Sequence, residues 1–166
     1  MRSVAVVLAG GTGTRVGFRL PKQLIKIAGK PIIEHTIGAM QQSPLIDEIV
    51  VMMAPGYLDE VREIVRRCDY TKVSQILEGA DTRNDTTAAA LAALGDEECN
   101  VLLHDAVRPL VSQTIIAANV DALQTYSAVD TAIPSADTRS SSRPCPSTEW
   151  SRPPTSAIRP RPTSNG

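Results

Sequence analysis

The sequence predicts an α/β domain with a mostly parallel sheet that is covered by helices on both faces. Along residues 1–138, short apolar runs typical of buried strands alternate with longer segments in which apolar residues recur at helical spacing. Three polar motifs each follow directly after a predicted strand. Ligands bind beyond the carboxyl ends of the strands in such sheets, so the pattern also predicts where a functional site lies.

The predicted elements alternate regularly between strand and helix. The apolar runs place five strands, at residues 3–8, 49–53, 73–77, 100–104 and 128–133. Helical spacing and helix-breaking residues place four helices. The first has Pro31 in its first turn and ends at Ser43-Pro44, and the second runs from about Leu58 to Arg67. The third runs from the polar turn 78–86 to near Leu94, and the fourth runs from a Ser112 cap to about Leu123.

The composition fits one globular domain and excludes several classes of function. Of 166 residues, 42% are hydrophobic and 3% aromatic, so the predicted core is aliphatic. Residues 1–138 carry a net charge of −5, which argues against a nucleic-acid partner, and residues 139–166 carry +4. Neither a signal peptide nor a run long enough to span a membrane is found, and three scattered cysteines fit reduced thiols. We therefore expect a cytoplasmic protein without a nucleic-acid or membrane partner.

The first polar motif combines glycines with two cations. Gly10, Gly11 and Gly13 have no Cβ atoms, so a ligand can approach the backbone N–H groups. Arg15 and Lys22 add positive charge to this loop. The glycines alone would favour a plain tight turn between a strand and a helix. With the two cations, the motif favours binding of a nucleoside triphosphate.

Two better-known phosphate loops are excluded. The dinucleotide fingerprint requires a glycine where Val16 stands, and Gly17 comes one place late. The Walker-type loop requires Gly-Lys-Ser/Thr at the start of a helix, and this triplet does not occur in the sequence. The loop therefore belongs to another kind of nucleotide site.

The stretch from Leu8 to Gln23 resembles the signature of small cytidylyltransferases that make CDP-linked sugar alcohols. It has a glycine-rich loop, then Arg15, then Pro21-Lys22-Gln23. The family has two well-known branches, which act on methylerythritol phosphate and on ribitol phosphate. The resemblance implies a three-layer, Rossmann-like nucleotidyltransferase domain (GT-A-like). It also implies CTP and a sugar-alcohol phosphate as substrates and Mg²⁺ as cofactor, and the family that it resembles is homodimeric.

A second motif, around Asp105, extends the resemblance. Asp105 ends a predicted apolar strand, and from the residues alone it is a surface carboxylate paired with Arg108. The order His-Asp-Ala and then Arg-Pro, however, is similar to the metal-binding signature of the family. On that resemblance Asp105 would hold Mg²⁺, which neutralises phosphate charge.

The third motif is the polar turn at residues 78–86. It resembles the family's turn that holds the cytosine and ribose of CTP, with Thr86 at a position where the family has serine and Ala80 at one where glycine is common. Plain capping of the following helix by Asp81 or Thr82 is the alternative. Farther on, Asp137-Thr138 is similar to a pair that contacts the acceptor.

The resemblance therefore implies a set of site residues. Arg15 and Lys22 would be catalytic, and Asp105 would bind the metal. The substrate-binding residues would be Leu8, Ala9, Gly10, Gly11, Gly13, Ala80, Asp81, Arg83, Thr86, Ala106, Arg108 and Thr138.

The resemblance ends near residue 138, and a different composition follows. Ser, Pro, Arg and Thr dominate residues 139–166, so too few apolar residues remain to offset the entropy cost of ordering. We expect a nucleotidyltransferase domain at 1–138 and a disordered tail at 139–166. The dimer arm, a second metal-binding Asp and a substrate-binding Lys of the family are missing, which suggests truncation or a reading-frame change.

The sequence thus predicts an enzyme that moves CMP from CTP to a sugar-alcohol phosphate and releases pyrophosphate. Leu8-Ala9-Gly10-Gly11 and Asp105-Ala106-Val107-Arg108 favour the ribitol-phosphate branch over the methylerythritol branch. Two alternatives stay open. One is a truncated CTP-binding remnant with weak or no catalysis, and the other is a transferase for another base, such as a hexose-phosphate uridylyltransferase or a molybdopterin-type guanylyltransferase.

Overall fold

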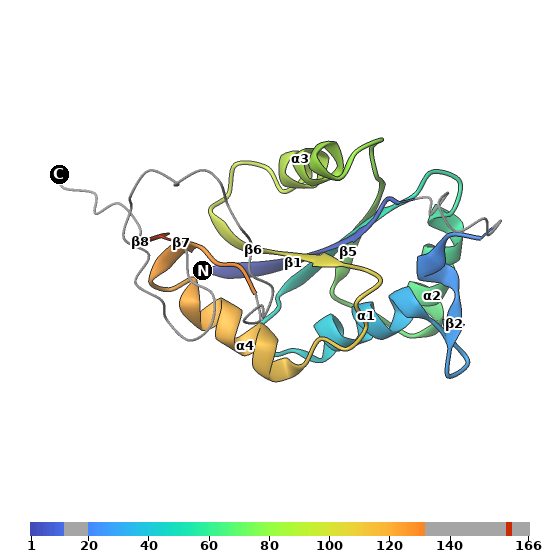
Figure 1. Ribbon diagram of the computed structural model, residues 1–166, viewed down its shortest axis with the longest axis horizontal. Helices are drawn as coiled ribbons and strands as arrows, with labels where there is room; N and C mark the ends of the chain where they lie inside the picture. Colours follow the sequence, from blue (N-terminus) through green and yellow to red (C-terminus); the bar gives the residue numbers. More distant parts are fainter. Residues whose placement is uncertain (12–19, 132–158, 161–166) are drawn as a thin grey trace, which may run out of the picture. The chain divides into compact units, whose positions relative to one another are not determined.

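Four parallel strands form the main sheet of the structure, a computed structural model that describes residues 1–11, 20–131 and 159–160. The strands are β1 (Arg2–Ala9), β4 (Glu48–Met53), β5 (Val73–Glu78) and β6 (Cys99–Asp105). They are hydrogen-bonded in the order β5-β4-β1-β6, and every neighbouring pair is parallel. The expected parallel sheet is confirmed (Figure 1).

The inner strands β1 and β4 are apolar along most of their length because both of their faces are covered. On one face, Val4 and Val6 belong to a buried cluster with Ala90 of the third long helix. Ala5 and Val7 alternate with them along β1, so they face the opposite layer, and both are completely buried. This two-sided burial is the reason why a nearly continuous apolar run forms a strand here.

The described residues form four longer helices, and the first three of them cover both faces of this sheet and complete three layers (Figure 1). The four are α1 (Ile32–Gln42), α2 (Leu58–Arg67), α3 (Arg83–Ala93) and α4 (Gln113–Ala122). Figure 1 shows α3 on one face, with α1 and α2 on the other. All four helices were predicted, and Ser112 caps α4 by accepting the Ile115 N–H at 3.2 Å. Pro31 lies one residue before α1 rather than in its first turn.

The order of the strands reverses at β1, and this reversal locates the site. From β1 the chain passes through α1 to β4 and through α2 to β5, always in the same direction across the sheet. It then crosses the other face through α3 and adds β6 on the free side of β1. Ligands bind at such a reversal, beyond the carboxyl ends of the two strands that border it. Here these are β1 and β6.

Three short elements between β1 and α1 were not predicted. The 3-10 helix η2 (Lys22–Leu24) is followed by a hairpin of β2 (Lys26–Ile27) and β3 (Lys30–Pro31). The turn places Ala28 at φ 50° and Gly29 at φ 81°, both in the left-handed region. An alanine seldom adopts this conformation, and strands of two residues are too short to leave a periodic pattern.

The chain divides into two units, Met1–Ala117 and Ala118–Gly166. In the second, β7 (Tyr126–Ala128) pairs antiparallel with β8 (Arg159–Pro160). The expectation of a fifth main-sheet strand at 128–133 is wrong for its described part, because Asp130 and Thr131 are exposed and interrupt the apolar run. Residues 132–133 lie outside the described residues, as does the expected tail at 139–166 apart from β8.

Candidate functional site

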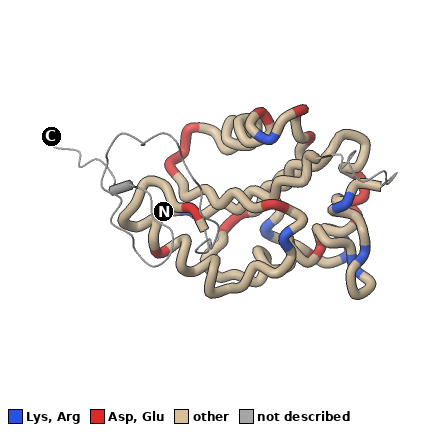
Figure 2. The backbone as a smooth tube through the Cα atoms, viewed as in Figure 1, with Lys and Arg blue, Asp and Glu red and all other residues tan. Residues whose placement is uncertain are grey.

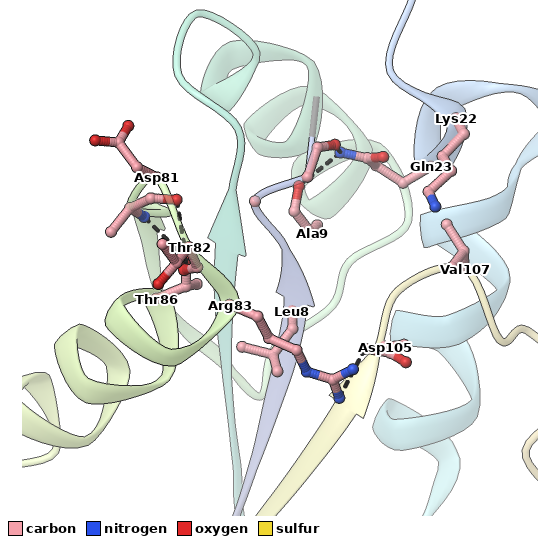
Figure 3. A pocket seen from close by; sticks show the side chains of 13 residues that line it. Leu8, Ala9, Lys22, Gln23, Asp81, Thr82, Arg83, Thr86, Asp105 and Val107 are labelled. Carbon is pink, nitrogen blue, oxygen red and sulfur yellow. Dashed lines mark hydrogen bonds and ion pairs between the residues drawn. The ribbon is translucent and has the colours of Figure 1, made fainter. Parts of the chain in front are cut away.

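A pocket opens at the carboxyl ends of β1 and β6, at the predicted edge of the sheet. Its volume is about 270 Å³. Three segments that are far apart in the sequence supply its walls: the end of β1, the turn before α3, and the end of β6, with η2 beside them (Figure 3). The lining residues are Leu8, Ala9, Gly10, Gly11, Lys22, Gln23, Ala80, Asp81, Thr82, Arg83, Thr86, Asp105 and Val107.

The wall between β1 and the turn before α3 depends on two glycines that cross at close range. A Cβ atom built on Gly79 would lie 2.8 Å from the Gly10 Cα, and one built on Gly10 would lie 3.3 Å from the Gly79 Cα. Gly79 is held in place because its N–H donates to the Met53 carbonyl at 2.7 Å. The backbone therefore reaches the pocket surface only because neither residue has a side chain.

Gly79→Ala is expected to lower the free energy of unfolding by about 1–3 kcal/mol, because the new methyl would overpack against the Gly10 backbone. Urea denaturation measures the change. Gly11→Ala is the matched control, since a Cβ there meets nothing within 4 Å and its effect should stay below about 0.5 kcal/mol. Equal losses in the two variants would contradict the close crossing.

The turn before α3 is held by two threonines. The Thr86 hydroxyl accepts the Ala80 N–H at 2.9 Å and lies 2.8 Å from the Thr82 carbonyl, to which it donates. Thr82 caps α3 by accepting the Asp85 N–H at 3.1 Å, so of the two capping residues considered from the sequence, Thr82 is the one observed. The Thr86 hydroxyl is thus used inside the protein, where it fixes the turn that carries Ala80 and Asp81.

Lys22 brings an unneutralised positive charge to the pocket. Its side chain extends from η2 toward Val107, and the residue is exposed (Figure 3). Among the described residues, no carboxylate forms an ion pair with the Lys22 ammonium. A cation without a counter-charge beside an open backbone loop attracts an anion.

Asp105 lies at the end of β6 between two arginines. Its Oδ1 pairs with Arg83 Nη2 at 3.1 Å (Figure 3). Its Oδ2 pairs with Arg108 Nε at 3.1 Å. The pairing with Arg108 that was considered from the sequence is therefore present. The pairing with Arg83 adds a link from β6 to the first residue of α3. The Asp105 side chain remains 22% exposed and forms part of the pocket wall.

Two of the residues expected to bind substrate do not line the pocket. Ala106 is completely buried, its N–H donates to the Leu8 carbonyl at 2.9 Å, and its carbonyl accepts the Thr36 hydroxyl at 2.8 Å. Arg108 points to Asp105 from outside the lining. Arg15, Gly13 and Thr138 lie outside the described residues.

Three lining residues were not expected, namely Gln23, Thr82 and Val107. Gln23 follows Lys22 in the Pro-Lys-Gln motif, and that motif was the one signal that could have identified it. Val107 belongs to the Asp105-Ala106-Val107-Arg108 stretch that was used to choose between the branches, but its apolar side chain gave no reason to expect it in the pocket wall.

The carboxylate of Asp105 fits a magnesium ion that shares its coordination with phosphate. Among the described residues, no group of three or more His, Cys, Asp or Glu side chains gathers as a metal cage. Mg²⁺ is usually held by one or two carboxylates, with substrate phosphates and water completing its shell. A single, partly exposed carboxylate in a pocket wall suits that arrangement, and its two arginine ion pairs are the contacts with which the ion would compete.

Charge and helix length add two observations. Within the first unit, basic and acidic positions are interspersed along the backbone (Figure 2). None of the helices in the described part of the chain is both long enough and apolar enough to cross a bilayer.

Comparisons with known proteins agree on one family. The family model described as IspD: 2-C-methyl-D-erythritol 4-phosphate cytidylyltransferase matches residues 3–143, so the match runs slightly past the expected boundary at 138. A 2-C-methyl-D-erythritol 4-phosphate cytidylyltransferase from Thermobifida fusca is 45% identical over 139 residues, which are 82% of this chain and 56% of that protein. The bifunctional ribulose 5-phosphate reductase/CDP-ribitol pyrophosphorylase Bcs1 of Haemophilus influenzae is 42% identical over 139 residues, 82% of this chain and 29% of that protein.

A solved structure supports the same assignment. The 4-diphosphocytidyl-2C-methyl-D-erythritol synthase of Anaerococcus prevotii aligns with a TM-score of 0.62 and 26% identity, over 79% of this chain and 57% of that one. The chain spans about half, or less, of the length of the curated relatives that it matches. Proteins named for methylerythritol phosphate and for CDP-ribitol match almost equally well, so the identities do not separate the two branches.

Proposed function

Because the chain belongs to the 2-C-methyl-D-erythritol 4-phosphate cytidylyltransferase family, we propose that it transfers CMP from CTP to a sugar-alcohol phosphate and releases pyrophosphate. The acceptor class is 2-C-methyl-D-erythritol 4-phosphate or D-ribitol 5-phosphate. Of the two we propose the ribitol type, on the basis of Leu8-Ala9-Gly10-Gly11 and Asp105-Ala106-Val107-Arg108. We also propose a cytoplasmic location, which fits the free thiols of Cys68 and Cys99.

The observation that carries the proposal is the combination of groups around the pocket at the end of β1. The glycine backbone approaches the pocket on one side, Lys22 adds a cation without a described counter-charge, and Asp105 adds a carboxylate. A triphosphate needs backbone donors and cations, and a divalent cation bound to it needs a carboxylate. The pocket offers all three kinds of group at one strand-order reversal.

The proposed reaction is an in-line displacement at the α-phosphorus of CTP. An oxygen of the acceptor phosphate forms a new bond to that phosphorus, while the bond to the oxygen bridging the α- and β-phosphates breaks. The bonding electron pair leaves with pyrophosphate. Such transfers require positioning and charge stabilisation more than covalent chemistry by the protein.

The roles of this chain's residues follow from that reaction. Lys22, together with Arg15, would offset the negative charge that grows on the departing pyrophosphate. Asp105 would hold Mg²⁺, and the chemistry that this ion supplies when bound is neutralisation of phosphate charge. To accept the ion, the Asp105 carboxylate would give up one of its two arginine contacts, and the Arg83 guanidinium would then be available to the nucleotide.

The experiment that tests this proposal separates binding from turnover. Thermal unfolding is followed with ATP, CTP, GTP and UTP, and pyrophosphate release is then measured with CTP and each of the two acceptors. We expect CTP alone to raise the midpoint clearly and pyrophosphate to appear with one acceptor. Stabilisation by another nucleotide would point to a different transferase, and binding of CTP without release would point to a nucleotide-binding role.

A further inference from the structure

Gln23 is a buried amide that contacts the backbone at the end of β1. Only 1% of the residue is exposed, although it lies in η2 directly after the exposed Lys22. Its Nε2 donates to the Ala9 carbonyl at 2.6 Å and to the Gly11 carbonyl at 3.2 Å (Figure 3). The two donors of one side-chain amide thus serve two carbonyls of the pocket wall, and the same nitrogen also lies 4.0 Å from the Met53 Sδ.

These two hydrogen bonds determine which way the pocket backbone faces. In a trans peptide the C=O of one residue and the N–H of the next point in opposite directions. With the Ala9 carbonyl held toward Gln23 and toward the Ala54 N–H at 3.2 Å, the Gly10 N–H points to the other side. Gly10 lines the pocket, so the orientation that suits an anion there is the one that Gln23 holds.

The same residue also controls where Lys22 is anchored. η2 is a tight turn in which the Leu24 N–H donates to the Pro21 carbonyl at 2.9 Å. Lys22 and Gln23 are neighbours in this turn, so a bond from Gln23 to the β1 end fixes the start of the Lys22 side chain relative to the loop. Gln23 thus joins the two anion-binding parts of the pocket, the backbone and the cation.

We propose that Gln23 is a positioning residue for the triphosphate, because its amide fixes the Ala9–Gly11 backbone and the Lys22 turn in the geometry that binds the nucleotide phosphates. This inference rests on the proposed function, since it assigns the anion in the pocket to the CTP phosphates. A purely structural Gln23 would stabilise the fold without setting phosphate affinity.

Two substitutions separate these roles. Gln23→Met retains the size of the side chain but donates no hydrogen bond. Gln23→Glu retains the shape, and its carboxyl can donate one hydrogen bond when protonated but none when ionised. Burial beside two carbonyl oxygens raises the pKa of such a carboxyl above its ordinary value, so the protonated form that can donate persists to higher pH than it would in water.

Binding of CTP and of inorganic pyrophosphate is measured by calorimetric titration. We expect Gln23→Met to weaken both by roughly tenfold or more, the size expected for loss of one or two hydrogen bonds. Gln23→Glu should bind nearly as well as the wild type at low pH and should lose affinity relative to it as pH rises. The pocket also has four charged side chains, those of Lys22, Asp81, Arg83 and Asp105. They are the same in both proteins, so the ratio of variant to wild-type affinity at each pH cancels their effect on the pH dependence.

Gln113 provides the matched control. Its Nε2 also donates to a backbone carbonyl, that of Ala39 at 2.8 Å, and it does not line the pocket. Gln113→Met and Gln113→Glu should leave CTP and pyrophosphate affinity unchanged at every pH. In turnover, Gln23→Met should raise KM for CTP more than it lowers kcat, whereas the Gln113 variants should change neither.

The outcomes keep this inference apart from the proposed function. Wild-type affinity in Gln23→Met, together with a lower unfolding midpoint, would overturn the positioning role. If the wild type itself does not bind CTP, the proposed function fails, and the amide resonances of Gly10 and Gly11 still test the positioning. They should shift in Gln23→Met and not in Gln113→Met, and unchanged resonances would overturn the positioning role.

If Gln23→Met does not fold, the pH dependence of CTP affinity in Gln23→Glu decides, and an affinity ratio that does not change with pH counts against the inference.

Discussion

Replacing Lys22 with methionine is expected to weaken CTP binding by roughly a hundredfold, because charge-assisted hydrogen bonds contribute about 1.5–3 kcal/mol. The Lys22 ammonium faces the pocket, and none of the described carboxylates neutralises it. A bound triphosphate would therefore gain a full ion pair without first displacing another partner. Calorimetric titration with CTP measures the loss.

The fold should tolerate this change. Lys22 is exposed, and surface cations contribute little to stability, so the free energy of unfolding should change by less than about 0.5 kcal/mol. Lys26→Met is the control, since Lys26 is an exposed lysine of the β2–β3 hairpin that does not line the pocket. If the two variants bind CTP equally well, Lys22 has no role in holding the nucleotide.

The location of the site was predicted because it depends on regular elements. Apolar runs and helical spacing identify which residues end a strand, and parallel strands bring those ends to one edge. This reasoning was enough to place Gly10 and Asp105 on the same pocket, although they are far apart in the sequence. The period of the pattern carries this information, and it does not require knowledge of side-chain contacts.

The contacts within the pocket could not be predicted in the same way. Glutamine usually lies at the surface, so apart from its place in the Pro-Lys-Gln motif nothing in the sequence predicts that Gln23 is buried while Gln113 is exposed. The pairing of Arg83 with Asp105 joins α3 to β6, and only the packed fold decides it. The two-residue strands of the hairpin are set by the positive φ of Ala28 and Gly29, which no hydrophobic pattern records.

Asp105→Asn is expected to lower kcat by at least about a hundredfold, which corresponds to a few kcal/mol of lost transition-state stabilisation. An amide is a poor ligand for a hard divalent cation, so the variant should also lose the dependence of CTP binding on Mg²⁺ concentration. Titration with CTP at several Mg²⁺ concentrations gives a readout that does not depend on turnover. The free energy of unfolding should change by less than about 1 kcal/mol, because the two partner arginines are 68% and 74% exposed.

Arg108→Met distinguishes a metal ligand from the surface ion pair that is also present. It removes the same Asp105–Arg108 contact but leaves the carboxylate in the pocket wall. If Asp105 matters only through that ion pair, the two variants should behave alike in every measurement. If it holds the cation, Arg108→Met should retain the Mg²⁺ dependence of CTP binding whatever happens to its turnover. Loss of that dependence in both variants, or in neither, would contradict the assignment of Asp105, because only Asp105→Asn removes a ligand that Mg²⁺ prefers.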